Sequence, residues 1–347
     1  MIDKGNLLQT LHCHTNNSDG ALTHREVLDT CSKNGIGVVA FTDHDTLPNE
    51  QQIKELQRLR GHPTKYIWGI EITSGYPKEA GHKEPNMFHI VGLFVNPRDK
   101  KLKELTIKTH RQRREKMKRR INEFRSLGFK VTEDEVFRTV SRNGIPTSLN
   151  LVNVLQSHPE NKEVLDKFVK QMRVLSQKDK KVEQLYQEML EDDRGDKQKY
   201  FNTFMKDESP LKIKLPEQVR PEMDTVVGLI RQAGGLAVLA HWTFDREKIK
   251  GPLLEKIVRE GRLDGVETVY DLFLLDRPIW KRKLQNDRAF LRRIVKKYQI
   301  FASGGVDAHK STDFPLFAAR KDYNQETIGL VETIIRQRHP NLENSSL

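Results

Sequence analysis

The chain has 347 residues, which is enough for one large α/β barrel or two modest domains with a buried core. Sixty Lys and Arg against 48 Asp and Glu give a formal charge of +12, which favours an anionic partner such as nucleic acid or a phosphorylated metabolite. Two cysteines argue against a disulfide framework and exclude thiolate zinc clusters. The first residues, MIDKGNLLQTL, lack the apolar run of a signal peptide, and no segment has the length of a membrane span. We therefore expect a cytoplasmic protein with no membrane partner, and we predict no protein partner.

Apolar, strand-like runs alternate with helical patterns along both ends of the chain. We expect strands within 7–14, 36–45 and 66–73, with helices within 25–35 and 49–61 between them. The same alternation resumes with a helix at 225–235, a strand at 236–241, a helix and a strand within 253–270, and a strand at 300–309. Alternating β and α units predict a parallel sheet or barrel with ligands at the carboxyl ends of the strands.

The middle of the chain differs from both ends in its composition and in its hydrophobic pattern. Residues 99–222 are polar, charged and largely helical in pattern, with no comparable strand. We interpret them as a basic helical subdomain inserted into one barrel that is formed by 1–98 and 223–347. Within the insertion, the polar segment 191–199 is expected to be a mobile loop.

Two histidines stand at the end of the first predicted strand, in LQTLHCHTNNSDG. Successive strand side chains point to opposite faces, so His12 and His14 share a face and Cys13 points away. Two neutral imidazoles leaving one strand end form half of a coordination shell for zinc, manganese or iron. By itself a His-x-His pair also fits an ordinary surface or core pair.

Most other predicted strands also end in a side chain that can bind a metal. These residues are His44, Glu71, His241, Asp307 and His309. His89 fits less well, because it lies near the start of its apolar run, 87–94. A chance scatter of twelve histidines would not place five of them at strand ends. We expect the histidines in polar helices or loops to be surface residues: His24, His62, His82, His110, His158 and His339.

These motifs together resemble those of the PHP (polymerase and histidinol phosphatase) family. They are His12-Cys13-His14, Ser18-Asp19-Gly20, Thr42-Asp43-His44-Asp45, Gly69-Ile70-Glu71, His89-Ile90, Ala240-His241 and Gly305-Val306-Asp307-Ala308-His309. The resemblance implies a metal-dependent phosphoesterase on an α/β fold, a distorted (β/α)7 barrel. The long insertion and the phrase GGLAVLAH followed by LDGVETVY are most similar to the branch that dephosphorylates nucleoside 3′,5′-bisphosphates and trims short RNA from its 5′ end.

The resemblance also implies nine metal ligands and two or three divalent ions. His12, His14, Glu71 and Asp307 would hold the first ion, with Glu71 bridging to a second ion held by His89 and His241. Asp19, His44 and His309 would hold the third. Two positions depart from the family pattern without removing a ligand: Trp242 stands where Pro is frequent, and Val306 stands where Ser is frequent.

This ligand set predicts catalysis by a metal-activated hydroxide, with manganese, iron and zinc all compatible with His and carboxylate. The sequence contains neither a Gly-x-Ser-x-Gly elbow nor a Walker-type loop, so no protein nucleophile is expected. Asp43 and Asp45 would either orient imidazoles or shuttle a proton, or stabilise a turn or a helix cap.

The inserted segment is expected to select the substrate. Between Arg98 and Arg125 there are 13 Lys or Arg and 4 Asp or Glu, which for most of these residues indicates a solvated face. Arg111 and Arg114, three residues apart on one helix face, would bind a substrate phosphate. Met117, Ile121 and Phe124 form a packing stripe. Where the nucleotide branch usually has Arg-Pro-His, this chain has Ser148-Leu149-Asn150; Asn150 is retained as a substrate hydrogen-bond donor.

The expected substrate is a nucleoside 3′,5′-bisphosphate or the 5′ end of a short RNA. Three alternatives remain open: a phosphatase for another metabolite such as histidinol phosphate, a nuclease that works from the 3′ end, and a non-catalytic nucleic-acid-binding protein with structural metals. A complete set of nine ligands argues against the last, because structural zinc sites are closed and four-coordinate.

Overall fold

The computed structural model describes residues 7–59, 61–81, 87–140, 144, 146–191, 220–270, 278–320 and 324–338. The chain divides into two compact units, each described here by itself. Unit 1 comprises Met1–Ile107 and Val219–Leu347, and unit 2 comprises Lys108–Gln218. The domain limits expected from the sequence fall at slightly different residues and stay a prediction. The loop expected at 191–199 lies, apart from its first residue, outside the described residues.

Unit 1 is built on a seven-stranded sheet in which the strands follow one another in chain order. The strands are β1 (Leu8–Thr10), β2 (Ile36–Phe41), β3 (Lys65–Gly75), β4 (Met87–Leu93), β5 (Leu236–Leu239), β6 (Gly265–Val269) and β7 (Phe301–Gly304). Neighbouring strands are parallel except that β4 runs antiparallel to both β3 and β5. The prediction of a parallel sheet was therefore wrong for β4. The physical reason is the short segment between β3 and β4, residues 76–86. Parallel neighbours must be joined by a crossover, usually a helix, of a dozen or more residues, whereas antiparallel neighbours can be joined by a shorter segment.

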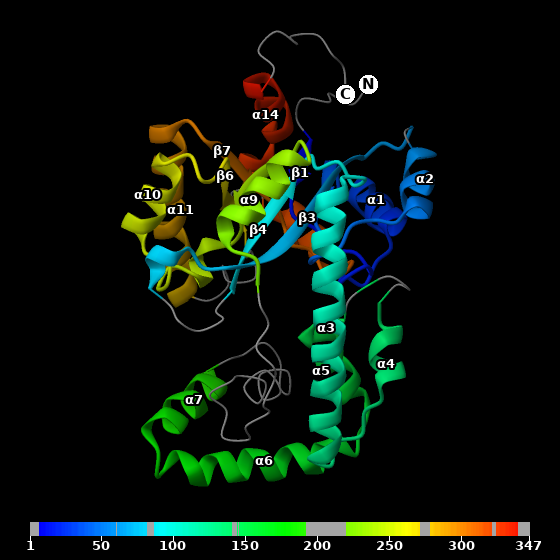
Figure 1. Cartoon of the computed structure of the whole chain (residues 1–347), viewed down its shortest axis with the longest axis vertical. Helices are drawn as coiled ribbons and strands as arrows, with labels where there is room; N and C mark the ends of the chain where they lie inside the picture. Colours follow the sequence, from blue (N-terminus) through cyan, green and yellow to red (C-terminus); the bar gives the residue numbers. More distant parts are fainter. Residues whose placement is uncertain are drawn as a thin grey trace. The chain divides into compact units, whose positions relative to one another are not determined.

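Helices connect the parallel strands of unit 1, as the alternating pattern predicted. The connecting helices are α1 (His24–Lys33), α2 (Glu50–Gln57), α10 (Gly251–Arg259) and α11 (Pro278–Tyr298). Helix α9 (Met223–Gln232) precedes β5, and α12 (Asp313–Ala319) and α14 (Leu330–Arg338) follow β7. Unit 1 also has short 3-10 turns, η2 (Lys78–Ala80), η3 (Trp242–Phe244) and η5 (Gln325–Thr327). Figure 1 shows α1 and α2 beside the β1–β3 side of the sheet, and α10 and α11 beside β6 and β7. Unit 1 is thus an α/β fold with a mostly parallel sheet.

Both faces of the sheet are buried, which explains why the strands read as continuous apolar runs. In β2, Val39 and Phe41 belong to the larger apolar cluster, which also contains the buried sides of α1 and α9. The alternate residues Val38 and Ala40 belong to a second cluster that includes Val331 of α14. Because successive side chains of a strand point to opposite faces of the sheet, neighbouring residues of β2 pack in two different apolar clusters.

The two edge strands of the sheet are linked beyond their ends. The amide of Leu11 donates to the carbonyl of Gly304, and the amide of His14 donates to the carbonyl of Ala308, both at 3.0 Å. The amide of Asp307 donates to the carbonyl of His12 at 3.1 Å. These bonds hold the segments that follow β1 and β7 next to each other.

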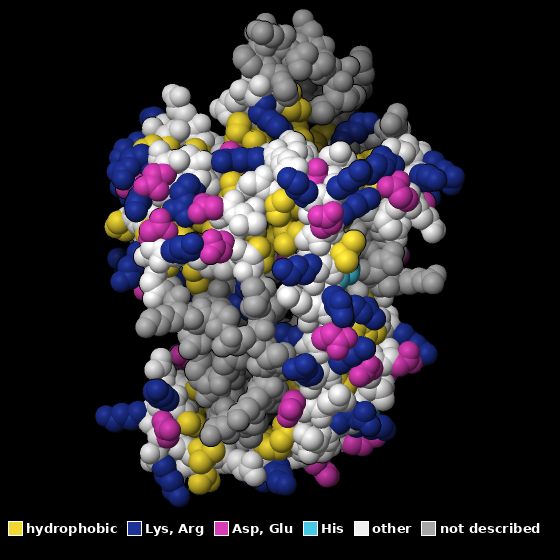
Figure 2. Space-filling model, in the orientation of Figure 1, with side chains coloured by type: hydrophobic (Ala, Val, Ile, Leu, Met, Phe, Trp, Pro, Cys, Tyr) yellow, Lys and Arg dark blue, Asp and Glu magenta, His cyan; other side chains and the backbone are white. Residues whose placement is uncertain are grey.

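Unit 2 is helical in its described part. Its helices are α3 (Lys100–Ser126), which begins in unit 1, and α4 (Glu133–Arg138), α5 (Ser148–Ser157), α6 (Asn161–Ser176) and α7 (Lys180–Glu191). Met117, Ile121 and Phe124 are buried in the apolar core of this unit, so the predicted packing stripe is confirmed. Figure 2 shows Lys and Arg side chains spread over the visible face with Asp and Glu among them. None of the described helices is long and apolar enough to cross a membrane.

Candidate metal centre

The predicted ligands meet at one edge of the sheet because strand ends converge there. His12 and His14 follow β1, His44 follows β2, His241 follows β5, and Asp307 and His309 follow β7. Carboxyl ends of parallel strands share an edge. The antiparallel direction of β4 explains the position of His89: the start of that strand lies at the same edge, with His89 paired opposite Thr73.

Glu71, inside β3, is the centre of the cluster. Its Oε2 atom lies 3.3 Å from the Nε2 atoms of both His12 and His14. The two Nε2 atoms are 3.2 Å apart. Asp307 Oδ1 lies 3.0 Å from His14 Nε2 and 3.4 Å from His12 Nε2. The four side chains thus direct nitrogen and oxygen atoms at one small volume.

The second oxygen of Glu71 faces a different pair of imidazoles. Its Oε1 atom is 2.8 Å from His89 Nδ1 and 3.1 Å from His241 Nε2. The carboxylate therefore stands between two groups of ligands, as a bridging carboxylate does.

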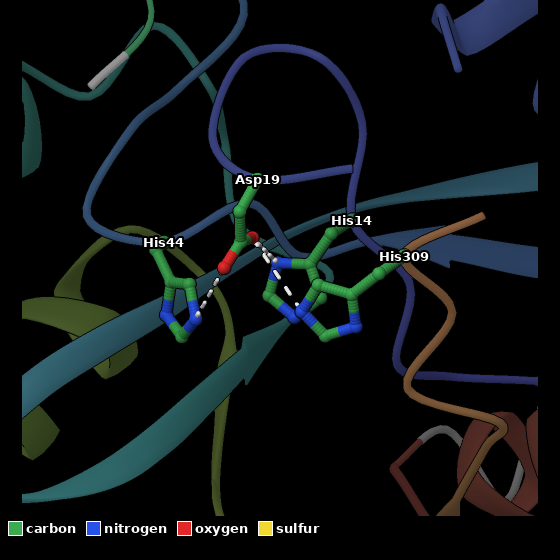
Figure 3. Close-up of side chains that lie close together, drawn as sticks. All are labelled: His14, Asp19, His44 and His309. Carbon is green, nitrogen blue, oxygen red and sulfur yellow. Dashed lines mark ion pairs between the residues drawn. The ribbon is translucent and has the colours of Figure 1, made fainter. Parts of the chain in front are cut away.

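A third group surrounds Asp19, whose carboxylate lies between the ring of His44 and the rings of His14 and His309 (Figure 3). Its Oδ2 is 3.7 Å from His44 Nε2, and its Oδ1 is 3.5 Å from His309 Nε2 and 3.6 Å from His14 Nδ1. His44 joins this group to Glu71, because its Nδ1 lies 2.8 Å from Glu71 Oε2. The structure thus brings all nine predicted residues into one cluster and adds His14 Nδ1 to the Asp19 group.

The spacing of these atoms fits metal ions better than it fits hydrogen bonds. Two atoms that each bind one ion at about 2.1 Å lie roughly 3.0 to 3.4 Å apart in octahedral or tetrahedral geometry. The buried cluster atoms without a hydrogen-bond partner in the described part of the chain include Asp19 Oδ1, His44 Nδ1, Glu71 Oε2 and Asp307 Oδ1. Even the 2.8 Å contact of His44 with Glu71 lacks hydrogen-bond alignment. Buried polar atoms without partners are costly unless a ligand satisfies them.

The electrostatic surroundings of the carboxyl groups in the cluster also fit a cation-binding site. Burial alone would raise the pKa of Glu71, but the imidazoles of His44, His89 and His12 outweigh it and hold that pKa well below its usual range. Likewise burial opposes ionisation of Asp307, yet His12 and His309 hold its pKa well below the usual range. The surroundings of both carboxyl groups therefore favour the ionised form, which is the form that binds a cation.

Sequence reasoning missed one carboxylate that supports the ligands, Glu267 of β6. It is buried, its Oε1 lies 2.8 Å from His12 Nδ1, and its Oε2 accepts the backbone N–H of His241 at 2.9 Å. A carboxylate on Nδ1 fixes the tautomer that leaves Nε2 as the metal-binding atom. The available signal was a carboxylate in the middle of an apolar strand, GVETV.

Asp43 and Asp45 accept hydrogen bonds from backbone amides and from hydroxyl groups. Asp43 accepts from the amide and hydroxyl of Thr15, both at 2.7 Å, and from the hydroxyl of Ser18 at 2.8 Å. Asp45 accepts from the amide and hydroxyl of Thr73 at 2.9 and 2.8 Å. Asp43 thus holds the turn that carries Asp19, and the same Ser18 hydroxyl lies 3.4 Å from His14 Nδ1. Both roles considered for these residues stay predictions.

Two of the predicted ligand positions have an unusual backbone. His241 has a φ of 26° and Asp307 a φ of 49°, in the region that non-glycine residues rarely adopt. Such conformations persist only where surrounding contacts enforce them, and they cluster at functional sites. Here each one turns the chain directly after a strand and aims a side chain into the cluster.

The residues of the cluster differ in their exposure to solvent. The side chains of Glu71, His12 and His14 are about 1% exposed, whereas those of His309 and His89 are 28% and 20% exposed. A small ligand can therefore reach the imidazoles at the rim while the bridging carboxylate stays buried.

The predicted substrate residues lie in unit 2. The guanidinium of Arg114 stacks on the ring of Phe137, with 4.2 Å to the ring centroid. Arg111 is exposed on α3. Asn150 is buried, and its Oδ1 accepts the amide of Thr147 at 2.7 Å, which caps α5. Their roles toward a substrate stay predictions.

The expectation that the other histidines are surface residues was wrong for His24. It is 6% exposed and packs edge-on against Phe41, with the ring centroids 4.6 Å apart. The first turn of α1 faces the core because its capping box, Thr23 with Glu26, starts the helix against the sheet. His62 and His158 are partly buried, and His82 and His339 lie outside the described residues.

The fold and the cluster together define a class: an α/β protein with groups of His, Asp and Glu side chains at one edge of its sheet that could hold metal ions. The model of the PHP domain matches residues 10–191, and the chain belongs to this family of metal-dependent hydrolases of phosphate esters. The match contains six of the nine predicted ligands; His241, Asp307 and His309 follow it in the chain. The family prediction made from the motifs is confirmed.

Three similar proteins indicate which activities occur among the relatives of this chain. A phosphoribosyl 1,2-cyclic phosphate 1,2-diphosphodiesterase of Eggerthella lenta is 36% identical over 89 residues, 26% of this chain and 31% of the relative. A 3′,5′-nucleoside bisphosphate phosphatase of Chromobacterium violaceum is 32% identical over 25% of this chain and 27% of its own length. A 5′-3′ exoribonuclease of Haemophilus influenzae is 22% identical over 86% of this chain and 89% of the relative. The first two matches thus span less than a third of the relatives' lengths.

A solved structure shows the same fold. A protein of Bifidobacterium adolescentis described as a metal-dependent phosphoesterase superposes with a TM-score of 0.61 at 20% identity, covering 87% of each chain. At this identity the likeness concerns the fold.

Proposed function

We propose that this protein is a metal-dependent phosphoesterase that hydrolyses phosphate esters of nucleotides. The observation that carries the proposal is the arrangement around Glu71: both its carboxylate oxygens lie between imidazoles, within one cluster of nine side chains in which His89 is partly exposed to solvent. We assign two or three divalent ions, manganese, iron or zinc, to these nine residues. The mostly parallel sheet and the bonds between the segments after β1 and β7 support closure into the distorted barrel typical of the family.

The side chains of the cluster would have different roles in catalysis. When bound, the divalent ions would acidify a water and neutralise the phosphate charge. Glu71 and Asp307 would set the negative charge that retains the ions. Glu267 would hold His12 in one tautomer, and the more exposed imidazoles, His89 and His309, would border the position of the phosphate.

The preferred substrates are nucleoside 3′,5′-bisphosphates and the 5′ end of short RNA. Two relatives are named for these activities, and one of them aligns with most of the chain. The formal charge of +12 favours such polyanions. We assign phosphate contacts to Arg111 and Arg114, and a hydrogen bond to Asn150. A second candidate is hydrolysis of a cyclic phosphate, which the relative with 36% identity favours.

The test is turnover by the manganese-loaded protein. Adenosine 3′,5′-bisphosphate, 5′-phosphorylated short RNA, a ribose cyclic phosphate and histidinol phosphate are incubated in parallel, and released phosphate or mononucleotide is measured. His14→Ala should abolish turnover, whereas His62→Ala, which changes a histidine that bonds Asp29 instead, should keep it.

Hydrolysis of the first two substrates that is lost in His14→Ala would support the proposal. Hydrolysis of only the cyclic phosphate or only histidinol phosphate would replace the substrate class. No turnover of any substrate by protein that elemental analysis shows to be metal-loaded would refute it.

A further inference from the structure

The exposed charges of α11 have one sign. Between Lys281 and Tyr298 the sequence of this helix has eight Lys or Arg and one acidic residue, Asp287. Asp287 is buried and therefore adds no negative charge to the surface. The exposed charged residues, named here the basic face of α11, are Lys281, Arg282, Arg292, Arg293, Lys296 and Lys297. This face concentrates positive potential on one side of the helix.

Other helices of unit 1 expose charges of both signs. Arg25 and Glu26 are exposed on α1, and Lys54 and Glu55 are exposed on α2. A mixture of signs is typical of a helix that only faces solvent, because opposite charges then attract each other. The single sign of α11 is therefore not a general property of the helices in this unit.

Part of the basic face of α11 is neutralised within the protein. Two of its cations are paired with carboxylates on neighbouring segments, Arg292 with Glu326 and Lys297 with Glu255. The remaining four have no carboxylate partner in the described part of the chain: Lys281, Arg282, Arg293 and Lys296. Of these, Arg293 lies over the ring of Phe290 in its own helix, 5.8 Å from the centroid. Most of the positive charge is thus available to an external anion.

The helix that carries this face is fixed beside the candidate metal centre. Because β6 and β7 are parallel neighbours, α11, which joins them, runs in the opposite direction and begins at the edge of the predicted ligands. Its middle packs against η3, which directly follows His241. The hydroxyl of Thr243 donates to Asp287 at 2.9 Å. The ring centroids of Trp242 and Phe290 lie 5.0 Å apart. A polyanion that extends from the metal centre can therefore continue along α11.

We propose that the basic face of α11 binds the sugar–phosphate backbone of an RNA substrate beyond the nucleotide that occupies the metal centre. The inference rests on the proposed function, because it assigns a second contact to the same substrate. Arg282 and Lys296 are about 21 Å apart along the helix axis, which exceeds the length of one nucleotide. Contacts to phosphates carry no information about the bases, so this face adds affinity for a longer strand without selecting its sequence.

A lipid membrane fits this face less well. A helix that binds at a membrane surface inserts large apolar side chains among the lipid head groups. On α11 such side chains are buried in the core of unit 1, as for Leu284, Leu291 and Ile294. None of the exposed large apolar residues in the described part of the chain lies on this helix. The face therefore offers charge alone, which suits a nucleic-acid backbone.

The test compares the loss of two exposed cations on different helices. Arg282→Gln with Arg293→Gln removes two charges from the basic face of α11. The matched control, Lys54→Gln with Arg58→Gln, removes two exposed charges at α2, which Figure 1 shows beside the other end of the sheet. Fluorescence anisotropy measures binding of an oligouridylate of about 12 nucleotides between about 0.05 and 1 M KCl. Its phosphorothioate linkages resist hydrolysis, so the manganese-loaded protein can be used.

The salt dependence of binding gives the expected result. For a single strand, each lost phosphate contact lowers the slope of log affinity against log salt by about 0.7. The α11 variant should therefore lose about 1.4 in slope, which over the tenfold range from 1 M to 0.1 M KCl is a loss of about 25-fold in affinity. The α2 control should keep the wild-type slope. The ratio of KM for 5′-phosphorylated RNA to KM for adenosine 3′,5′-bisphosphate should rise only in the α11 variant.

A wild-type slope and affinity in the α11 variant, or equal losses in both variants, would overturn the inference. Unchanged RNA binding together with lost binding to phosphatidylserine vesicles would also overturn it and would assign the face to a membrane. Because the anisotropy measurement needs no turnover, it is separate from the test of the proposed function. If the wild type hydrolyses no substrate, the proposed function fails, and the binding data still decide about α11.

Discussion

At the scale of single residues, the metal centre depends on how Glu71 is held. The carboxylate is fully buried, yet both its oxygens stand within about 3 Å of imidazole nitrogens from different strands. Residues that only orient the ligands, such as Glu267, should then affect metal binding without being ligands themselves.

Replacing Glu267 tests this supporting role. We expect Glu267→Ala to weaken metal binding by about 10- to 100-fold, because His12 loses the partner of its Nδ1 atom and His241 loses the acceptor of its backbone amide. Competition with a chromophoric chelator measures the affinity. Glu255→Ala, which removes an exposed partner of Lys297, serves as the control. Equal affinities in the two variants would contradict the role of Glu267.

His24 should make stability depend on pH. Burial lowers the pKa of His24 below its usual value, although Asp43 and Glu55 act in the opposite direction. Below about pH 6.5 the unfolded chain therefore binds a proton that the folded chain refuses, and stability falls as the pH falls. We expect His24→Phe to lose less unfolding free energy between pH 7.5 and 5.5 than the wild type does. Urea unfolding of both metal-free proteins at the two pH values measures it; parallel losses would show that His24 does not contribute.

At the scale of elements, the close approach of the segments after β1 and β7 positions His12 and Asp307. Gly305 makes this approach possible, because a Cβ there would lie 2.6 Å from Thr10 Oγ1 and 2.7 Å from the amide nitrogen of His12. The absence of a side chain at this position is thus a structural requirement.

Gly305→Ala should separate these segments. We expect a loss of about 1–3 kcal/mol in unfolding free energy and weaker metal binding, because backbone at His12 must shift. Gly228→Ala is the control: no atom lies within 4 Å of its Cβ, and Ala is favoured within α9. Denaturant titrations of both variants measure the effect. A Gly305→Ala protein as stable as the control would rule out the tight approach.

Asn150 has a capping role in the first turn of α5 and a proposed role in substrate binding. Two substitutions can separate these roles. Asn150→Asp keeps a carboxylate oxygen for the amide of Thr147 but places negative charge beside any bound phosphate. We expect near wild-type stability with a raised KM for adenosine 3′,5′-bisphosphate. Asn150→Ala should lose about 1 kcal/mol of stability through the lost cap. An unchanged KM in Asn150→Asp would show that the residue only caps the helix.

At the scale of the whole molecule, all nine proposed ligands belong to unit 1 and none to unit 2. Ions bound only to the folded state stabilise that state in proportion to the logarithm of their concentration. Their removal should therefore act on one unit.

Chelation should loosen unit 1 selectively. After treatment with EDTA we expect faster hydrogen exchange in peptides from the ends of β1, β3 and β7, and unchanged exchange in peptides from α5 and α6. Exchange followed by mass spectrometry, with and without added manganese, gives both readings in one sample. A uniform change across both units would indicate that the metals stabilise the protein as a single cooperative body.

Much of unit 1 was predictable because its strands and the positions of its candidate metal ligands follow local sequence patterns. Strand runs such as 36–45 predicted both β2 and the position of His44 at its end, and the spacing of His12 and His14 placed both on one face. The sequence could not show that β4 is reversed, since apolar runs carry no sign of strand direction. His89 therefore looked out of place until its pairing with β3 was seen.

By itself the sequence determined the residue types of the site, the alternation of strands and helices, and the family. The tertiary structure decided which atoms face each other: both oxygens of Glu71 between imidazoles, and Glu267 behind His12. The physical reason is that local patterns depend on neighbours along the chain. Ligand distances, burial and exposure arise only when segments far apart in the chain, such as those after β1 and β7, lie side by side.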